Sequence, residues 1–400
     1  MNWLTRFKAL FVLTYTGFLG NIAVIYYLSR GLSYSEIGLA TAFSALGFFL
    51  FEVPTGVVGD RVSRKTSVLI GLSIYPLSLL LLLFLRNFWM LLVSELISVL
   101  GASFISGSLQ AWFFDNLKSE GREGEFKEIW RSIQKATVLA SSSTTIAGAF
   151  MAQLWGFEVP ILLSLILHLT MIPLTWSIPE MGFSKLETSY TSHVIHSFRE
   201  LLKPEVFWLI TYLLTVTLSL TQFRNFFEPY LGEVLAKSLG TTIMGTLGIL
   251  GIVEVLTRTA PRYAGIALKG RSGRLLHETA PVAIPLSTLL SVLYPNAVFI
   301  IALGIMATLF ASAFTFNFSV EFQRRIPSEK RATILSLRNM VLAIVSALFY
   351  AVYGFVVQHM GLRKARLMFA LLFLAFGASF KLAQLGPLGK YLVMGEGEKE

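Results

Sequence analysis

The chain has 400 residues, of which 54% are hydrophobic and 14% are charged, and its formal net charge is +10. A soluble domain carries about 25% charged residues, so the composition excludes an ordinary water-soluble protein and favours an integral membrane protein. The absence of cysteine excludes disulfides, thiolate metal sites and cysteine nucleophiles.

Long stretches without Asp, Glu, Lys or Arg predict membrane-spanning helices, because a bilayer core of about 30 Å needs about 20 apolar residues. The stretches lack the alternation of an outer-membrane barrel, which leaves an all-α fold. We expect twelve spans. In chain order they cover 7–28, 37–59, 66–85, 88–114, 129–155, 160–178, 206–231, 239–256, 276–293, 297–320, 332–358 and 363–384.

A polar stretch between the sixth and seventh spans divides the chain into two halves. The predicted domains are an N-terminal six-helix bundle over 1–179, a cytoplasmic central linker over 180–204 and a C-terminal six-helix bundle over 205–400. The fourth and tenth spans both end in an acidic residue that a basic loop follows. Two six-helix halves of the same orientation are the parallel-repeat plan of one class of secondary transporter.

The distribution of positive charge predicts the orientation in the membrane. With the N-terminus in the cytoplasm, 24 of the 33 Lys and Arg residues fall in cytoplasmic segments and six fall outside. The positive-inside rule therefore predicts a multi-pass protein of the cell membrane with both termini cytoplasmic. Arg363, Lys364 and Arg366 disagree, because they would lie outside, and the side of this cluster stays open.

The segment GVVGDRVSRK, residues 56–65, interrupts two apolar stretches. Gly56 and Gly59 allow two helices to approach closely. Asp60 can accept hydrogen bonds from the free amides at the N-terminus of a neighbouring helix, where negative charge is favourable. The basic residues anchor the hairpin at the cytoplasmic face; they are Arg61, Arg64 and Lys65.

This segment resembles the signature loop between helices 2 and 3 of the major facilitator superfamily, and the twelve spans and basic central loop also resemble that superfamily. The matching residues are Gly56, Asp60, Arg61, Arg64 and Lys65, whereas Ser63 stands where glycine is usual. The resemblance implies that Asp60 lies against the start of helix 11 at Arg331, and that the basic residues reach Asp115 at the end of helix 4. These contacts would hold the two halves together when the transporter faces outward. Alternatively, the charges only set the topology.

The resemblance also implies that helices 1, 4, 7 and 10 line a central substrate cavity. The candidate cavity residues are Asn21, Gln110, Gln222, Arg224, Asn225 and Asn317. Arg224 and Glu228 are four residues apart, so on one helix they would share a face and could pair. The alternative is that this pair is structural.

Carboxyl groups within spans are candidates for proton coupling, because an ionisable group in the membrane is costly and usually functional. The candidates are Glu52, Glu95 and Glu228, and Glu52 could alternatively brace helix 2. His168 is interpreted as a core histidine. Ile97 stands where proton-coupled relatives often carry Arg, and the fifth span lacks a Gly-Pro pair, which counts against a multidrug antiporter.

No enzyme signature occurs in the sequence, and neither a cofactor nor a metal is predicted. We therefore expect a secondary active transporter that moves a small organic solute by alternating access, with a proton-linked exporter as one form. Its expected partners are the small-molecule substrate, protons and the lipid bilayer, without nucleic acid, and the protein is expected to be monomeric. The alternative is a non-transporting membrane sensor or receptor that keeps the transporter fold.

Overall fold

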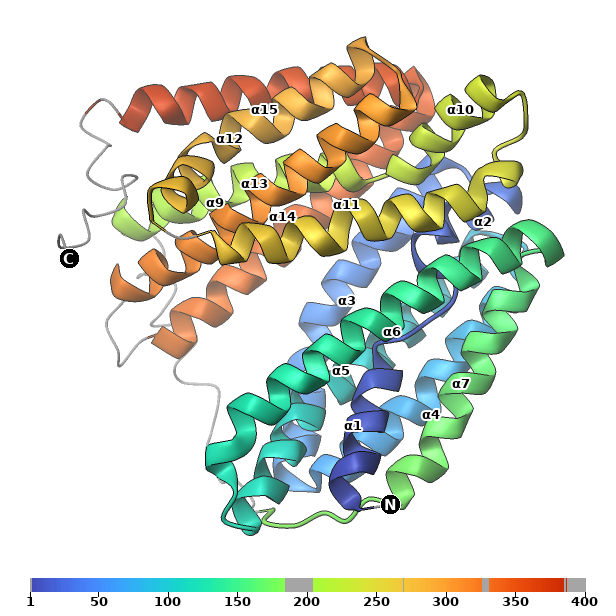
Figure 1. Ribbon diagram of the computed structural model, residues 1–400, viewed down its shortest axis with the longest axis vertical. Helices are drawn as coiled ribbons and strands as arrows, with labels where there is room; N and C mark the ends of the chain where they lie inside the picture. Colours follow the sequence, from blue (N-terminus) through green and yellow to red (C-terminus); the bar gives the residue numbers. More distant parts are fainter. Residues whose placement is uncertain (1, 184–203, 269, 326–330, 385, 387–400) are drawn as a thin grey trace. The chain divides into compact units, whose positions relative to one another are not determined.

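A computed structural model of the chain describes residues 2–183, 204–268, 270–325, 331–384 and 386, and within them it contains helices and no strands (Figure 1). The chain forms two compact units, one of residues 1–188 with 241–252 and the other of residues 189–240 with 253–400. Most of the predicted central linker lies outside the described residues, so its boundaries stay a prediction.

The first six predicted spans each overlap a helix or a broken helix of the first unit. These elements are α1 (Trp3–Thr14), η1 (Gly20–Ile22), α2 (Ala23–Ser29), α3 (Tyr34–Arg61), α4 (Arg64–Leu83), α5 (Phe88–Ser119), η2 (Glu123–Glu125), α6 (Phe126–Trp155) and α7 (Glu158–Trp176).

The last six predicted spans correspond in the same way to the remaining helices. These are α9 (Pro204–Arg224), α10 (Phe227–Leu239), η3 (Met244–Thr246), α11 (Leu247–Ala267), α12 (Gly270–Leu293), α13 (Ala297–Arg325), α14 (Arg331–Met360) and α15 (Leu362–Gln384). By length and composition, eight described helices could cross a membrane, or nine if the sharply bent pair formed by 207–239 and 244–267 is one span.

The first predicted span is not continuous. The helix stops at Thr14 and resumes through η1, so an irregular segment interrupts the predicted range 7–28. Gly20 has a φ of +48°, which L side chains rarely adopt. A Cβ atom at Gly148 of α6 would lie 1.7 Å from the Phe18 carbonyl oxygen, so α6 approaches the irregular segment at backbone contact. Hydropathy alone does not reveal such a break.

Small residues set the packing of α4 against α5. A Cβ atom at Gly71 would lie 2.6 Å from the carbonyl oxygen of Gly101 on the facing helix. Such close approach maximises van der Waals contact, which drives helix association where lipid removes the hydrophobic driving force. At one end of this unit, a buried aromatic cluster joins α1 to α5, with the Phe7 and Trp112 ring centroids 4.9 Å apart.

The seventh predicted span, 206–231, and the eighth, 239–256, have wrong boundaries. The chain breaks at Asn225 and Phe226, because Phe226 has a φ of 56° and is the one described non-glycine residue in the left-handed region. A second helix, α10, then continues to Leu239, and Gly240 ends it with a φ of +64°. The eighth span consequently begins only at Leu247.

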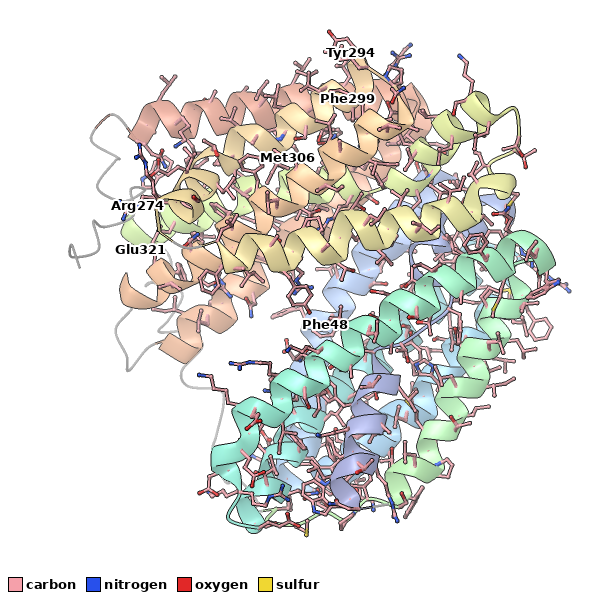
Figure 2. The ribbon with its side chains drawn as sticks, viewed as in Figure 1. Phe48, Arg274, Tyr294, Phe299, Met306 and Glu321 are labelled. Carbon is pink, nitrogen blue, oxygen red and sulfur yellow. The ribbon has the colours of Figure 1, made fainter. Side chains whose placement is uncertain are left out.

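Large apolar side chains are exposed on both units, and helices that face lipid carry such side chains. Figure 2 labels four examples, of which Phe48 belongs to the first unit; Tyr294, Phe299 and Met306 belong to the second. Within the second unit, Arg274 and Tyr294 lie toward opposite ends of α12 (Figure 2). A basic end and an aromatic end are typical of a helix that crosses a membrane.

Candidate functional site

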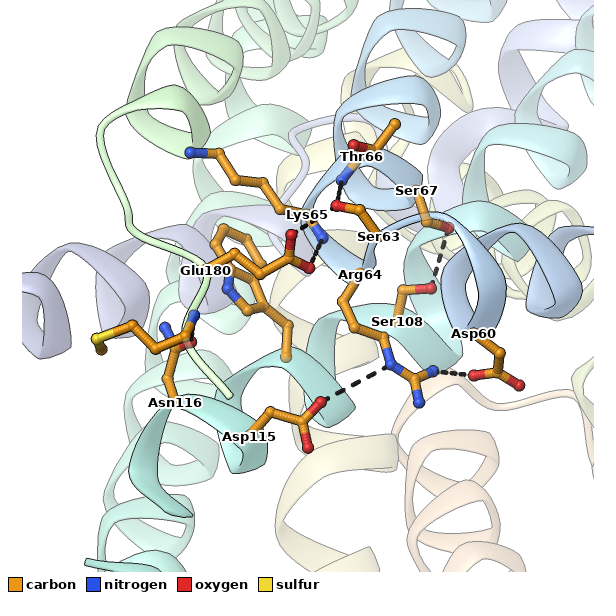
Figure 3. Close-up of polar contacts among 12 residues, drawn as sticks. Asp60, Ser63, Arg64, Lys65, Thr66, Ser67, Ser108, Asp115, Asn116 and Glu180 are labelled. Atoms are coloured by element: carbon orange, nitrogen blue, oxygen red, sulfur yellow. Dashed lines mark hydrogen bonds and ion pairs between the residues drawn. The ribbon is translucent and has the colours of Figure 1, made fainter. Parts of the chain in front are cut away.

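The signature segment forms a very short connection between α3 and α4. Only Val62 and Ser63 separate the two helices, so most of the segment 56–65 is helical. Ser63 caps α4, because its hydroxyl accepts a hydrogen bond from the Thr66 amide at 2.9 Å (Figure 3). Its φ of −177° is extended and suits any residue, so serine can replace the usual glycine and add a cap.

Arg64 links the ends of three helices. Its guanidinium pairs with Asp60 on α3, and its Nε lies 3.9 Å from Oδ2 of Asp115 on α5 (Figure 3). The Arg64 side chain is 17% exposed and each carboxylate is 27% exposed. The structure thus brings together three of the residues that the sequence analysis selected, with two carboxylates around one guanidinium.

Glu180 belongs to the same cluster, and sequence reasoning missed it. Its carboxylate accepts hydrogen bonds from the Ser63 hydroxyl at 2.7 Å and from the Lys65 amide at 2.9 Å (Figure 3). A carboxylate is favourable there, because the N-terminus of α4 carries positive partial charge. Lys65 itself donates to the backbone carbonyls of Trp176 and Ile178 at the end of α7. An acidic residue directly after the sixth span was the available signal.

The expectations for the other residues of the segment 56–65 agree with the structure only in part. A Cβ atom at Gly59 would lie 2.3 Å from the Ser108 hydroxyl, so this glycine does allow close approach. Gly56 does not, because a Cβ atom there would meet no described atom within 4 Å. Arg61 is exposed. The side chain of Arg331 lies outside the described residues, so the contact between Asp60 and helix 11 stays a prediction.

The predicted pairing of Arg224 with Glu228 is wrong. The helix breaks between them, so the two residues do not share a helical face. Glu228 is 4% exposed and pairs instead with Arg258 of α11 at 3.1 Å, and Arg258 also pairs with Glu254. Arg224 donates to the Thr308 hydroxyl of α13 at 3.2 Å.

Arg366, one of the three basic residues whose side of the membrane stays open, is buried inside the second unit on α15. Its side chain has no exposed surface, and Nη1 donates to the carbonyl oxygens of Phe223 at 3.1 Å and Asn225 at 3.5 Å. The guanidinium also lies 4.7 Å from the ring centroid of Tyr230. The cation therefore binds the carbonyl end of α9, where negative partial charge collects.

Of the remaining cavity candidates, Gln222 and Asn225 both form hydrogen bonds with Arg366. Gln222 is fully buried and donates to the Arg366 carbonyl oxygen, so it lies in a bundle interior rather than along a path. Asn317 donates to carbonyls of α12 and α13, and Gln110 is exposed. The Asn21 side chain lies outside the described residues. Glu52 is exposed, and its role in proton coupling stays a prediction.

A cavity of about 410 Å³ lies within the first unit, beside the break in the first span. It is lined by Thr14, Thr16 and Gly17 from the end of α1 and the irregular segment, and by side chains of α2, α4, α5 and α7. Glu95 of α5 lines it, and its carboxylate accepts hydrogen bonds from the Ser44 hydroxyl at 2.9 Å and the Tyr27 hydroxyl at 3.2 Å.

His168 of α7 lines the same cavity. It is 6% exposed, and its ring stacks on Tyr75 with centroids 4.6 Å apart. Nδ1 lies 2.8 Å from the Ser164 carbonyl oxygen, which can only accept, so Nδ1 carries a proton, and in the neutral ring Nε2 presents a lone pair. The residue interpreted as a core histidine is thus buried, but it also lines a cavity together with a carboxyl group.

Comparison with known sequences identifies the family. The sequence profile described as the Major Facilitator Superfamily matches residues 8–350. The chain belongs to the major facilitator superfamily. This confirms the predicted family and the all-α membrane fold.

Individual superfamily members resemble the chain at low sequence identity. An uncharacterized transporter of Buchnera aphidicola is 24% identical over 42% of this chain and 40% of its own length. An uncharacterized MFS-type transporter of Bacillus subtilis is 26% identical over 38% of this chain and 37% of its own length. The chain therefore matches only about two fifths of these relatives.

Solved structures of superfamily members share the fold. The nucleoside transporter NupG has a TM-score of 0.78 at 16% identity, covering 96% of this chain and 99% of that one. A bacterial homolog of the human lysosomal transporter Spinster, inward-facing and unoccupied, has a TM-score of 0.67 at 14% identity, with 95% of each chain covered.

Proposed function

We propose that the protein is a secondary active transporter that moves a small organic solute across the cell membrane by alternating access, as a proton-linked exporter with both termini in the cytoplasm. The observation that carries this proposal is the Arg64 cluster. It joins the ends of three helices through charged groups that remain partly exposed, so they are available to a second partner. A cluster that only fixed topology would not need Asp60 and Asp115 to share one guanidinium.

Alternating access requires contacts that hold one orientation and release in the other. Asp60, which pairs with Arg64 among the described residues, can exchange partners when the halves move. For the proton, Glu95 supports the proposal best among the carboxyls selected from the sequence, because it faces a cavity and accepts two neutral hydroxyl donors. Glu228 already has an arginine partner, and Glu52 is exposed.

The proposal is tested in two steps with the detergent-purified full chain. A thermal-shift screen of lipophilic cations, antibiotics, sugars, nucleosides, amino acids and organic anions first identifies a ligand. A ligand at 100 times its dissociation constant stabilises the fold by about 2.7 kcal/mol, enough to detect. Flux of that ligand is then measured in proteoliposomes, with and without a pH gradient.

We expect saturable flux that a pH gradient accelerates. Arg64→Ala should lose most of the flux and still show the thermal shift, because Arg64 joins the ends of helices and does not line the cavity of the first unit. Arg122→Ala, in an exposed loop of the same unit, is the matched control and should transport normally. Binding without flux in the unmodified protein would instead indicate a sensor, and flux indifferent to the pH gradient would refute the proton link.

A further inference from the structure

We propose that the cavity within the first unit is a binding site for an organic ammonium ion, with Glu95 as its counter-charge and His168 as a hydrogen-bond acceptor. This inference deepens the proposed transport function and rests on it. The charge, the dipoles and the hydrogen-bonding capacity of the residues that line this cavity all favour such a ligand.

The charge of the lining favours a cation. Glu95 is the one acidic residue among the described lining residues, and no Lys or Arg lies among them. Its two hydroxyl donors use two of roughly four lone-pair positions on the carboxylate, so it can still accept from a ligand. An anionic ligand would meet a carboxylate with no compensating cation in the lining.

The break in the first predicted span also favours a cation in the cavity. The end of α1 reaches the cavity at Thr14 and Thr16, so the negative end of this helix dipole lies beside the ligand space. The rings of Tyr27 and Tyr75 also line the cavity, and aromatic faces attract ammonium groups.

The hydroxyl groups of the lining act mainly as acceptors. Five of them donate their hydrogen to backbone carbonyl oxygens: Thr14, Thr16, Ser78, Ser94 and Ser164. The Tyr27 hydroxyl donates to Glu95. These hydroxyl groups can therefore still accept hydrogen bonds from a ligand through their lone pairs. The cavity is therefore rich in acceptors and poor in donors, which complements a ligand that carries N–H donors.

His168 adds a preference for primary ammonium over quaternary ammonium. Because Nδ1 donates to the Ser164 carbonyl, the Nε2 lone pair can accept an N–H bond, and no described residue supplies one. A trimethylammonium group has no N–H to donate. The cavity volume of about 410 Å³ lies in the range of small-molecule sites and exceeds what a bare metal ion needs.

The test uses four ligands that share one benzyl or phenyl ring: two cations, benzylamine and benzyltrimethylammonium, the neutral benzyl alcohol and the anion benzoate. Thermal unfolding of the full chain is followed against the concentration of each, with sodium chloride as a further arm. We expect stabilisation in the order benzylamine, benzyltrimethylammonium, benzyl alcohol, with none from benzoate.

Two variants assign the site. Glu95→Gln keeps the size of the side chain and should weaken benzylamine binding about 10- to 100-fold, the worth of a charged hydrogen bond. Glu128→Gln, the same change at an exposed position of α6, should bind as the unmodified protein does. His168→Phe keeps a ring to stack on Tyr75 and should reduce the preference for benzylamine over benzyltrimethylammonium.

Several outcomes would overturn the proposal: equal stabilisation by benzyl alcohol, unchanged binding by Glu95→Gln, stabilisation by sodium ion alone, or no response to either ammonium ligand up to its solubility limit. Flux separates this proposal from the transport function. A protein that moves a neutral or anionic solute and ignores the ammonium ligands keeps its transport function. If the protein binds benzylamine but moves no solute, the ammonium site is supported and the transport function is refuted.

Discussion

The contact between Gly148 and Phe18 positions the irregular segment of the first span. A Cβ atom at residue 148 would lie 1.7 Å from the Phe18 carbonyl oxygen and 2.8 Å from its Cα, both of them backbone atoms that cannot rotate away. The Phe18 amide is held from another side by the Ser164 hydroxyl at 3.0 Å. One missing methyl group therefore allows the segment that borders the cavity to lie where it does.

Gly148→Ala should consequently destabilise the protein and displace this segment. We expect the free energy of unfolding to fall by about 1–3 kcal/mol, as overpacking of a tight contact usually costs, with weaker binding at the cavity. Unfolding by denaturant in detergent measures the change. Gly107→Ala in α5 is the matched control, because a Cβ there meets nothing within 4 Å. Equal stability of both variants would contradict the close approach.

At the scale of one element, the break between α9 and α10 depends on Arg366 of α15. The last carbonyls of a helix have no partner within it, and a buried carbonyl without a donor is costly. Arg366 supplies that donor to Phe223 and Asn225, while the rings of Phe223 and Tyr230 lie beside its charge. A side chain from the last described helix thus stabilises a bend in the first helix of the second half.

Arg366→Met should remove the donor and keep most of the volume. We expect the free energy of unfolding to fall by about 1–3 kcal/mol for each carbonyl left without a partner. Lys364→Met, at an exposed position of the same helix, should be close to neutral. Unfolding in detergent compares the two variants. A neutral Arg366→Met would mean that the break is stable without this cation.

At the scale of the whole molecule, the orientation in the membrane can be tested without removing any residue, because the chain contains no cysteine. Arg86 and Glu123 lie beyond opposite ends of α5, whose 32 residues extend about 48 Å at 1.5 Å per residue. Such a helix exceeds the bilayer core of about 30 Å. The two positions must therefore face opposite sides of the membrane if α5 crosses it.

Single cysteines at these two positions should label differently in intact cells. A membrane-impermeant maleimide should modify Arg86→Cys directly and Glu123→Cys only after permeabilisation. The reverse pattern would invert the proposed topology, and labelling of both in intact cells would show that α5 does not span.

The sequence predicted the fold class because each membrane span can be recognised from the hydropathy of its own residues. It also selected residues that meet in space, since Arg64 contacts both Asp60 and Asp115. A dense cluster of charges between two apolar spans has few places to lie except one membrane face. The sequence did not reveal the role of Glu180. Its hydrogen bond with the Lys65 amide depends on where the end of α7 meets the start of α4.

What the sequence determined by itself was the class of protein, because the cost of placing polar backbone in lipid leaves helices as the means of crossing for such apolar stretches. The tertiary structure alone decided where helices break and which buried charges pair. The break at Phe226 separates Arg224 from Glu228, and Arg366 of α15 is fully buried against the end of α9. These outcomes depend on backbone angles and on contacts between residues far apart in the chain, and a local pattern of hydropathy contains neither.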